Sequence, residues 1–211
     1  MRKVLITILL AAVSTLAQSG PAPKEIFRDS DGNLISNNEF VDIRMANFMY
    51  PDATIVTLLD DGRKEFRLQK VPQEGMAAPN FDVKTLDGKR ITLAGLRGKV
   101  VVLNFWFIGC PACRGQEPKL NDLKAKFAGR ADVVFLAMTP DPAPDVRRYL
   151  AKEAFHYLHV ADAEALMKPF HFLGYPKNIV ISKAGEMVYW RSTIHAWDKF
   201  EAVINTELAK D

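Results

Sequence analysis

The most informative stretch of this 211-residue chain is VVVLNFWFIGCPAC, residues 100–113. Residues 100–108 form a near-continuous apolar run that is rich in β-branched and aromatic side chains. A run of this kind is typical of a strand that is buried on both faces, as at the centre of an α/β sheet. The run ends at Gly109, and Cys110 and Cys113, which are the only cysteines of the chain, follow at once.

The residues after this strand predict a helix over about 111–128. Pro111 takes its first position, where the N–H group that proline lacks is not needed. Cys110 then lies at the positive end of the helix dipole, which favours a thiolate. Because the thiolate is the attacking species, we predict that Cys110 is the nucleophile. Cys113, one turn further on and more buried, is expected to resolve a mixed disulfide formed on Cys110.

Strands and helices alternate on both sides of this junction. A hairpin is expected upstream, over residues 81–93. Downstream we expect a strand at 132–138, a helix at 142–154, a short strand at 157–162, a helix at 163–172, two strands around a turn at 183–185 and a helix at 196–210. This order predicts an α/β fold with a mixed central sheet and helices on both faces.

The first residues have the features of a secretory signal peptide. Arg2 and Lys3 precede an apolar stretch, and small residues allow cleavage after Ala17. The stretch is shorter than the roughly 20 apolar residues of a spanning helix. We therefore predict that residues 1–17 are removed and that the protein is exported to the periplasm or another extracytoplasmic compartment, where disulfides persist.

The composition gives no indication of nucleic acid as a partner. The formal net charge is +3, and the loss of Arg2 and Lys3 would lower it to +1, so the basicity predicts nothing about polyanions. A chain of this length can bury a core large enough to fold without a disulfide. We expect the main domain to span residues 76–211 and the protein to be a monomer.

Residues 18–75 are expected to form an N-terminal β-rich extension of the main domain. One hairpin is predicted to turn at Asp31–Gly32 and a second at 60–62. Between them, Ser36 and Glu39 have the spacing of a capping box, which predicts a short helix. These elements are too few for us to expect an independent domain.

Zinc binding and a permanent structural disulfide are the alternatives to redox chemistry at the cysteine pair. Zinc sites usually need four ligands, and the other candidates are scattered histidines at positions 156, 159, 171 and 195. A bridge across so short a loop adds little chain-entropy stabilisation. We therefore predict that Cys110 and Cys113 form a redox-active pair, with no metal and no other cofactor.

Three segments resemble the thioredoxin-like extracytoplasmic thiol–disulfide oxidoreductases of the TlpA/ResA type, within the redoxin or AhpC/TSA superfamily. They are APNFDVKTLDGKRITLAGLRGK (78–99), GKVVVLNFWFIGCPACRGQEPKLNDL (98–123) and LGYPKNIVI (173–181). The resemblance implies a thioredoxin-like fold over about residues 76–210. It also implies a cis peptide bond before Pro176, beside Cys110, with the backbone of Tyr175 helping to dock the extended chain of a partner protein.

Two positions that carry acidic groups in related proteins carry amides in this chain. Thioredoxins have a buried aspartate six residues before the first cysteine, where this chain has Asn104, a residue that is common there in the TlpA/ResA group. The TlpA/ResA group often has a glutamate three residues after the second cysteine, where this chain has Gln116. Two interpretations of Glu117 stay open, because it follows Cys113 by one helical turn. It is either an acid–base group for Cys113 or a solvent-facing glutamate.

Two residues before the cysteines also bear on the site. Trp106 is expected to pack in the core against the helix that follows, and not to contact a ligand. Gly109 stands where relatives often have tryptophan, which predicts a more open rim beside Cys110.

The resemblance implies a reductase of protein disulfides that receives electrons from a membrane thiol-transfer protein. Two other functions stay open. A peroxiredoxin-type peroxidase needs Thr or Ser three residues before its peroxidatic cysteine, and Phe107 at that position argues against it. A Sco-like copper-binding module would use both cysteines and a distant histidine such as His195, but such proteins place three residues between their cysteines.

Overall fold

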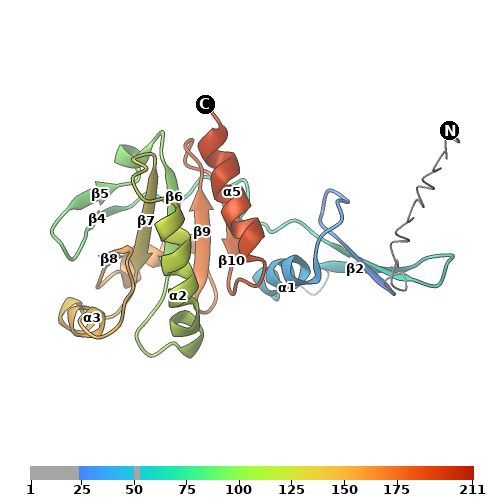
Figure 1. Cartoon of the computed structure of the whole chain (residues 1–211), viewed down its shortest axis with the longest axis horizontal. Coiled ribbons are helices and arrows are strands. Elements are labelled where there is room, and N and C mark those ends of the chain that lie inside the picture. Colours follow the sequence, from blue (N-terminus) through green and yellow to red (C-terminus); the bar gives the residue numbers. More distant parts are fainter. Residues whose placement is uncertain (1–23, 50–52) are drawn as a thin grey trace, which may run out of the picture.

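The computed structural model describes residues 24–49 and 53–211. Its body is a five-stranded sheet with the strand order β10-β9-β6-β7-β8 (Figure 1). The strands are β6 (Val100–Phe105), β7 (Val133–Met138), β8 (Leu158–Val160), β9 (Lys177–Ile181) and β10 (Met187–Arg191). β6 pairs in parallel with β7 and antiparallel with β9, so the sheet is mixed, as predicted.

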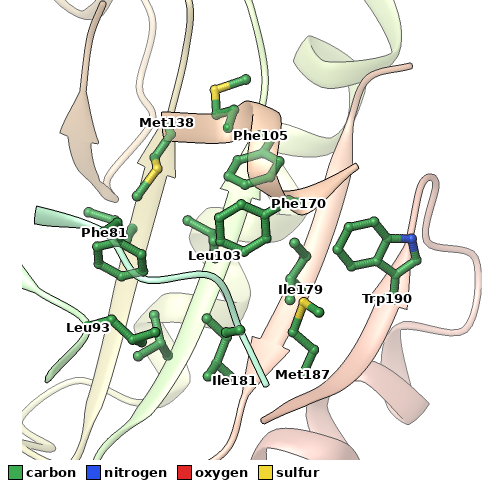
Figure 2. Packing of buried hydrophobic residues seen from close by; sticks show 14 of the residues in the cluster. Phe81, Leu93, Leu103, Phe105, Met138, Phe170, Ile179, Ile181, Met187 and Trp190 are labelled. Carbon is green, nitrogen blue, oxygen red and sulfur yellow. The ribbon is translucent and has the colours of Figure 1, made fainter. Parts of the chain in front are cut away.

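The central strand β6 is buried on both faces, which confirms the interpretation of its apolar run. Leu103 and Phe105 point to one face, where Figure 2 shows them packed with Met138, Phe170 and Ile179. The other face joins a second hydrophobic cluster, which includes both cysteines. The strand ends at Phe105, three residues earlier than predicted, where its parallel partner β7 ends at Met138.

Helices cover both faces of the sheet, which confirms the predicted fold class. The remaining elements of the main body are β4 (Asp82–Lys84), β5 (Arg90–Thr92), the 3-10 helix η1 (Ala94–Leu96), α2 (Pro111–Lys126), α3 (Ala143–Leu150), α4 (Glu164–Met167), the 3-10 helix η2 (Lys168–Phe170) and α5 (Trp197–Ala209). Buried apolar residues of α2, α3 and α5 belong to the cluster that contains the cysteines, whereas those of α4, η2, β4 and β5 belong to the other.

The predicted helix at 163–172 is wrong in its length. The α-helical part, α4, covers only four residues and passes into η2. Pro169 lies inside η2, where it has no N–H group to continue the helix. His171 then adopts a left-handed conformation with φ of 49°, which ends the element.

Before the main body, residues 24–68 form a three-stranded sheet and one helix. These elements are β1 (Glu25–Arg28), α1 (Asn37–Ala46), β2 (Thr54–Leu58) and β3 (Lys64–Leu68), with the strand order β1-β3-β2. The second predicted hairpin is confirmed as β2–β3. The short helix is confirmed as α1, whose N-cap Ser36 accepts a hydrogen bond from the Glu39 N–H (3.1 Å).

The first predicted hairpin is wrong in its pairing. The chain turns at Asp31–Gly32, but only one isolated antiparallel bridge, between Arg28 and Leu34, follows the turn. β1 pairs in parallel with β3 instead, and this pairing brings Phe27 against Phe66, with ring centroids 5.6 Å apart. Apolar packing with β3 therefore determines the position of β1.

A buried carboxylate attaches α1 to the main body. Asp42 is 1% exposed, and its carboxylate accepts hydrogen bonds from the N–H groups of His195 (2.8 Å) and Ala196 (2.9 Å). It also pairs with Nδ1 of His195 at 2.6 Å. Because these N–H groups immediately precede α5, Asp42 caps that helix from another part of the chain.

Apolar packing joins the same parts. Ile43, Leu68 and Val71 belong to the hydrophobic cluster that contains Met187 and Trp190 of β10. In Figure 1, α1 lies beside β10, and the hairpin β2–β3 projects away from the body. The described residues before position 76 thus complete the core at one edge of the main sheet. The domain boundary at residue 75 stays a prediction, and the predicted signal peptide, residues 1–17, lies outside the described residues.

No helix in the described ranges is both long enough and apolar enough to cross a membrane.

Candidate functional site

The two cysteines are joined by a disulfide at the start of α2. Cys110 is the N-cap residue, and its sulfur accepts a hydrogen bond from the Cys113 N–H at 3.1 Å. Pro111 takes the first helical position, as predicted. The backbone N–H groups of the first turn therefore point toward the sulfur that we predict to be the nucleophile, and they favour its anionic form after reduction.

Both cysteines are almost fully buried, and Cys113 is hardly more buried than Cys110. Their exposed fractions are 3% for Cys113 and 4% for Cys110, whereas Gly109, Pro111 and Ala112 are exposed. Cys110 is covered although Gly109 beside it is exposed, and a rim more open than that of relatives with tryptophan at this position stays a prediction. A partner protein therefore meets backbone and small side chains first.

An aromatic pair borders this loop. The ring of Phe107 lies edge-on against Tyr175, with centroids 5.1 Å apart. A Cβ atom added to Gly109 would lie 3.2 Å from the Phe107 ring, which is tighter than an ordinary contact. A larger residue at position 109 would therefore push this ring, so the glycine accommodates Phe107 in its present place.

The Tyr175–Pro176 peptide bond is cis, the isomer that the family resemblance implies. Lys177, which follows, is the first residue of β9 and pairs with Phe105 at the end of β6. The loop that contains Pro176 therefore lies at the same end of the sheet as Cys110. Tyr175 is half-buried, and its contact with Phe107 joins the two loops.

Trp106 is a core residue, as expected. It is fully buried and packs against Tyr149, Phe155 and His159, with ring centroids 5.3 to 5.6 Å apart. The same cluster includes Cys113. Burial lowers the pKa of His159 to about 4, so this ring is neutral near pH 7. Trp106 thus belongs to the hydrophobic core on which the buried face of α2 packs.

Glu117 faces the protein interior, so its interpretation as a solvent-facing residue is wrong. It is 5% exposed, and the hydroxyl of Tyr149 donates to its two carboxylate oxygens, at 2.8 and 2.9 Å. Burial raises the pKa of Glu117, while the hydrogen bond from Tyr149 acts in the opposite direction. The neighbouring charges of Glu153 and Arg114 have smaller, opposing effects.

Three neutral amide side chains, those of Asn104, Gln116 and Asn178, are joined by hydrogen bonds beside the site. The Asn104 amide donates to Asn178 Oδ1 (2.8 Å), and the Asn178 amide donates to Gln116 Oε1 (3.1 Å) and to the Ser192 carbonyl (2.9 Å). All three amide side chains are buried. Asn178 was missed by the sequence analysis, although a lone asparagine inside the apolar run of β9 was a usable signal.

Asp141 was missed as well. It lies just after β7, and one of its carboxylate oxygens accepts a hydrogen bond from the Ile108 N–H at 2.8 Å. The sequence did contain an indication of this role, because an acidic residue follows a predicted buried strand. The carboxyl ends of parallel strands are where α/β sheets place functional groups.

No set of three or more His, Cys, Asp and Glu side chains within the described ranges is arranged to hold a metal ion. His195, the histidine considered for copper, pairs with Asp42 instead of the cysteines.

The fold and the disulfide at the strand-to-helix junction define a thioredoxin-like thiol–disulfide oxidoreductase. A sequence profile described as the AhpC/TSA family matches residues 75–190, so the chain belongs to this family. The match covers the main sheet and α2 and leaves out β1 to β3, α1 and α5.

Individual relatives agree with this assignment. The thioredoxin-like protein YneN of Bacillus subtilis is 29% identical over 54% of this chain and 68% of its own length. The thiol-disulfide oxidoreductase ResA of Bacillus thuringiensis subsp. konkukian is 29% identical over 58% of this chain and 72% of its own.

Solved structures have the same fold. One from Bacteroides thetaiotaomicron, proposed to be a protein disulfide isomerase, is 28% identical with a TM-score of 0.59, over 65% of this chain and 91% of its own. A thiol:disulfide interchange protein of Chlorobium tepidum TLS, 24% identical over 64% of this chain and 98% of its own, has a TM-score of 0.56 and supports the fold alone.

Proposed function

We propose that the protein is an extracytoplasmic reductase of protein disulfides. The observation that carries this proposal is the disulfide whose first cysteine caps α2 beside the loop of the cis-proline. The direction of electron flow rests on the resemblance to the TlpA/ResA type. The proposal includes export through the predicted signal peptide, action as a monomer, and a membrane thiol-transfer protein as the electron donor.

In the proposed reaction, the Cys110 thiolate of the reduced protein attacks one sulfur of a substrate disulfide. The substrate S–S bond breaks, one substrate sulfur leaves as a thiolate, and a mixed disulfide forms on Cys110. Cys113 then loses its proton and attacks the Cys110 sulfur. The mixed disulfide breaks, the second substrate thiolate leaves, and the protein keeps the Cys110–Cys113 disulfide. Two electrons pass to the substrate, and the donor later restores the dithiol.

The docking of substrate is assigned to the loop around the cis-proline. Pro176 is buried, whereas Leu173, three residues earlier, is 53% exposed. The backbone of Tyr175 precedes β9 at the end of the sheet where Cys110 lies. An extended substrate segment could pair with this backbone and bring its disulfide to Cys110, the mode of binding that the resemblance implies.

A turnover assay tests this function. The reduced protein, regenerated by dithiothreitol, is expected to accelerate the reduction of insulin disulfides, and Cys110→Ser is expected to fall to the rate of dithiothreitol alone. Consumption of hydrogen peroxide in place of insulin would support the peroxidase instead. Tight Cu(I) binding that is lost in His195→Ala would support the copper module.

We also propose that Glu117 is the acid–base group for Cys113. It lies on the buried face of α2, four residues after Cys113, and its carboxyl belongs to a poorly hydrated environment, which raises its pKa. A carboxyl of this kind can take the Cys113 proton as the resolving thiolate forms. No other carboxyl on α2 before Pro118 is available, because the first turn has no acidic residue.

Glu117→Gln tests this role through the pH profile of Cys113 alkylation, measured in a Cys110→Ser background. With Glu117 present, we expect an inflection above the usual pKa range of glutamate, and Glu117→Gln should remove it. Tyr149→Phe is a second test. It removes the hydrogen bond that lowers the pKa of Glu117, so the inflection should move to higher pH. A profile that Glu117→Gln leaves unchanged would contradict the role.

A further inference from the structure

The loop that carries Cys110, residues 107–110, has few hydrogen bonds to the rest of the protein. The Cys110 N–H donates to the carbonyl of Phe107 within the loop itself, at 3.1 Å. Among the hydrogen bonds of the described residues, one connects this loop to a distant segment. It runs from the Ile108 N–H to Oδ2 of Asp141, at 2.8 Å. The position of the loop therefore depends on Asp141.

Asp141 is itself held in place. The Thr139 hydroxyl donates to the same Oδ2 at 2.6 Å, and the Asp141 N–H donates back to that hydroxyl at 3.2 Å. The Asp141 carbonyl accepts a hydrogen bond from the Asp162 N–H at 2.9 Å, which connects the segment after β7 to the segment after β8. With its side chain and backbone both bonded, Asp141 is a fixed support for the catalytic loop.

The charge of Asp141 has no cationic partner in the described part of the chain, where no ion pair includes it. Its influence reaches the rim of the site, since Asp141 adds to the raised pKa of Tyr175, after burial and Glu164. Ile108 is two residues from Cys110. A residue spans at most about 3.6 Å, so the carboxylate oxygen that binds Ile108 lies within about 10 Å of the Cys110 backbone nitrogen.

We propose that Asp141 is a positioning residue that holds the catalytic loop and whose negative charge opposes the thiolate of Cys110. A less stable thiolate makes the dithiol a stronger reductant, because the reduced form is stabilised less, and it makes the sulfur more nucleophilic. The inference rests on the proposed function, to which it adds a reason for the direction of electron flow.

Other charged groups lie near the two cysteines, but they do not cancel the effect of the Asp141 charge on the Cys110 thiolate. On α2, Arg114 is 3.6 Å from Glu153, so these charges offset one another. Glu117 is buried, is hydrogen-bonded to Tyr149 and follows Cys113 by one turn of α2. The helix dipole of α2 favours the thiolate. The charge of Asp141 thus disfavours the Cys110 thiolate, whereas the dipole of α2 favours it.

Asp141→Asn separates charge from position. The asparagine Oδ1 can still accept from Ile108 and Thr139, but the charge is gone. We expect the pKa of the Cys110 thiol to fall, with an acid dissociation constant roughly fivefold larger at low salt. The equilibrium with glutathione should also shift toward the dithiol, because the more stable thiolate stabilises the reduced form. Asp141→Ala should do the same and also speed hydrogen exchange at the Ile108 N–H.

The matched control is Asp145→Asn. Asp145 is an exposed carboxylate at the start of α3 that pairs with Arg148, so the variant removes a nearby charge without touching the loop. Alkylation of the reduced thiol against pH, with Cys113 replaced by serine, reports on Asp141 whether or not the protein reduces disulfides. A Cys110 pKa that is equal in Asp141→Asn, Asp145→Asn and the parent would overturn the inference.

Discussion

The Cys113→Ser variant is expected to remain attached to its protein substrates through a disulfide on Cys110. The first attack needs only the Cys110 thiolate, whereas release of the substrate needs the thiol one helical turn behind it. Turnover should therefore fall to background, and covalent adducts should accumulate. Non-reducing electrophoresis followed by mass spectrometry would identify a linkage to Cys110 that dithiothreitol removes.

Cys110→Ser is the control for this experiment. It keeps one cysteine in the same cluster, but Cys113 is the third residue of α2 and not its N-cap, so its sulfur lacks the backbone N–H hydrogen bond that the Cys110 sulfur accepts. We expect equally low turnover and no adducts. Adducts of similar yield on Cys113 would contradict the assignment of the nucleophile.

Asp42→Ala is expected to lower the free energy of unfolding by about 3 kcal/mol. The substitution leaves the buried N–H group of Ala196 and the part-buried N–H group of His195 without their acceptor, and a buried loss of this kind costs roughly 1–3 kcal/mol. It also removes the cap of α5. Urea denaturation followed by circular dichroism would measure the change, since the midpoint should fall at an unchanged slope.

The control for Asp42 is Asp31→Ala, in the same N-terminal segment. Asp31 is exposed in the turn after β1, so its loss should change the free energy of unfolding by less than about 0.5 kcal/mol. If Asp42→Ala were as stable as Asp31→Ala, α1 would not be anchored to the main body through this carboxylate.

The fold was largely predictable from local sequence because its central elements are defined by their own residues. The apolar run of β6 and the proline at the start of α2 give the strand, the helix and the position of Cys110 between them. The parallel partner of β1 was not predictable. Nothing near Phe27 indicates that Phe66, on a strand that follows α1, forms its neighbour.

The site was predictable where its chemistry is local and unpredictable where it depends on packing. The cysteine spacing fixed the reactive pair. The burial of Glu117, in contrast, depends on Tyr149, which lies 32 residues away on α3. Asp141 reaches Ile108 across 33 residues. Such pairings follow from the way parallel strands bring loops to one end of a sheet, and no spacing within the chain indicates them.

The equilibrium of the Cys110–Cys113 pair with glutathione decides whether the protein can act as a reductase. Buffers of defined potential, followed by trapping of free thiols and mass spectrometry, give the fraction of dithiol at each potential. We predict a reversible two-electron transition near the reducing end of the thioredoxin-fold range, about −270 mV. A midpoint near the oxidising end, about −120 mV, or a disulfide that no buffer reduces in the folded protein, would contradict it.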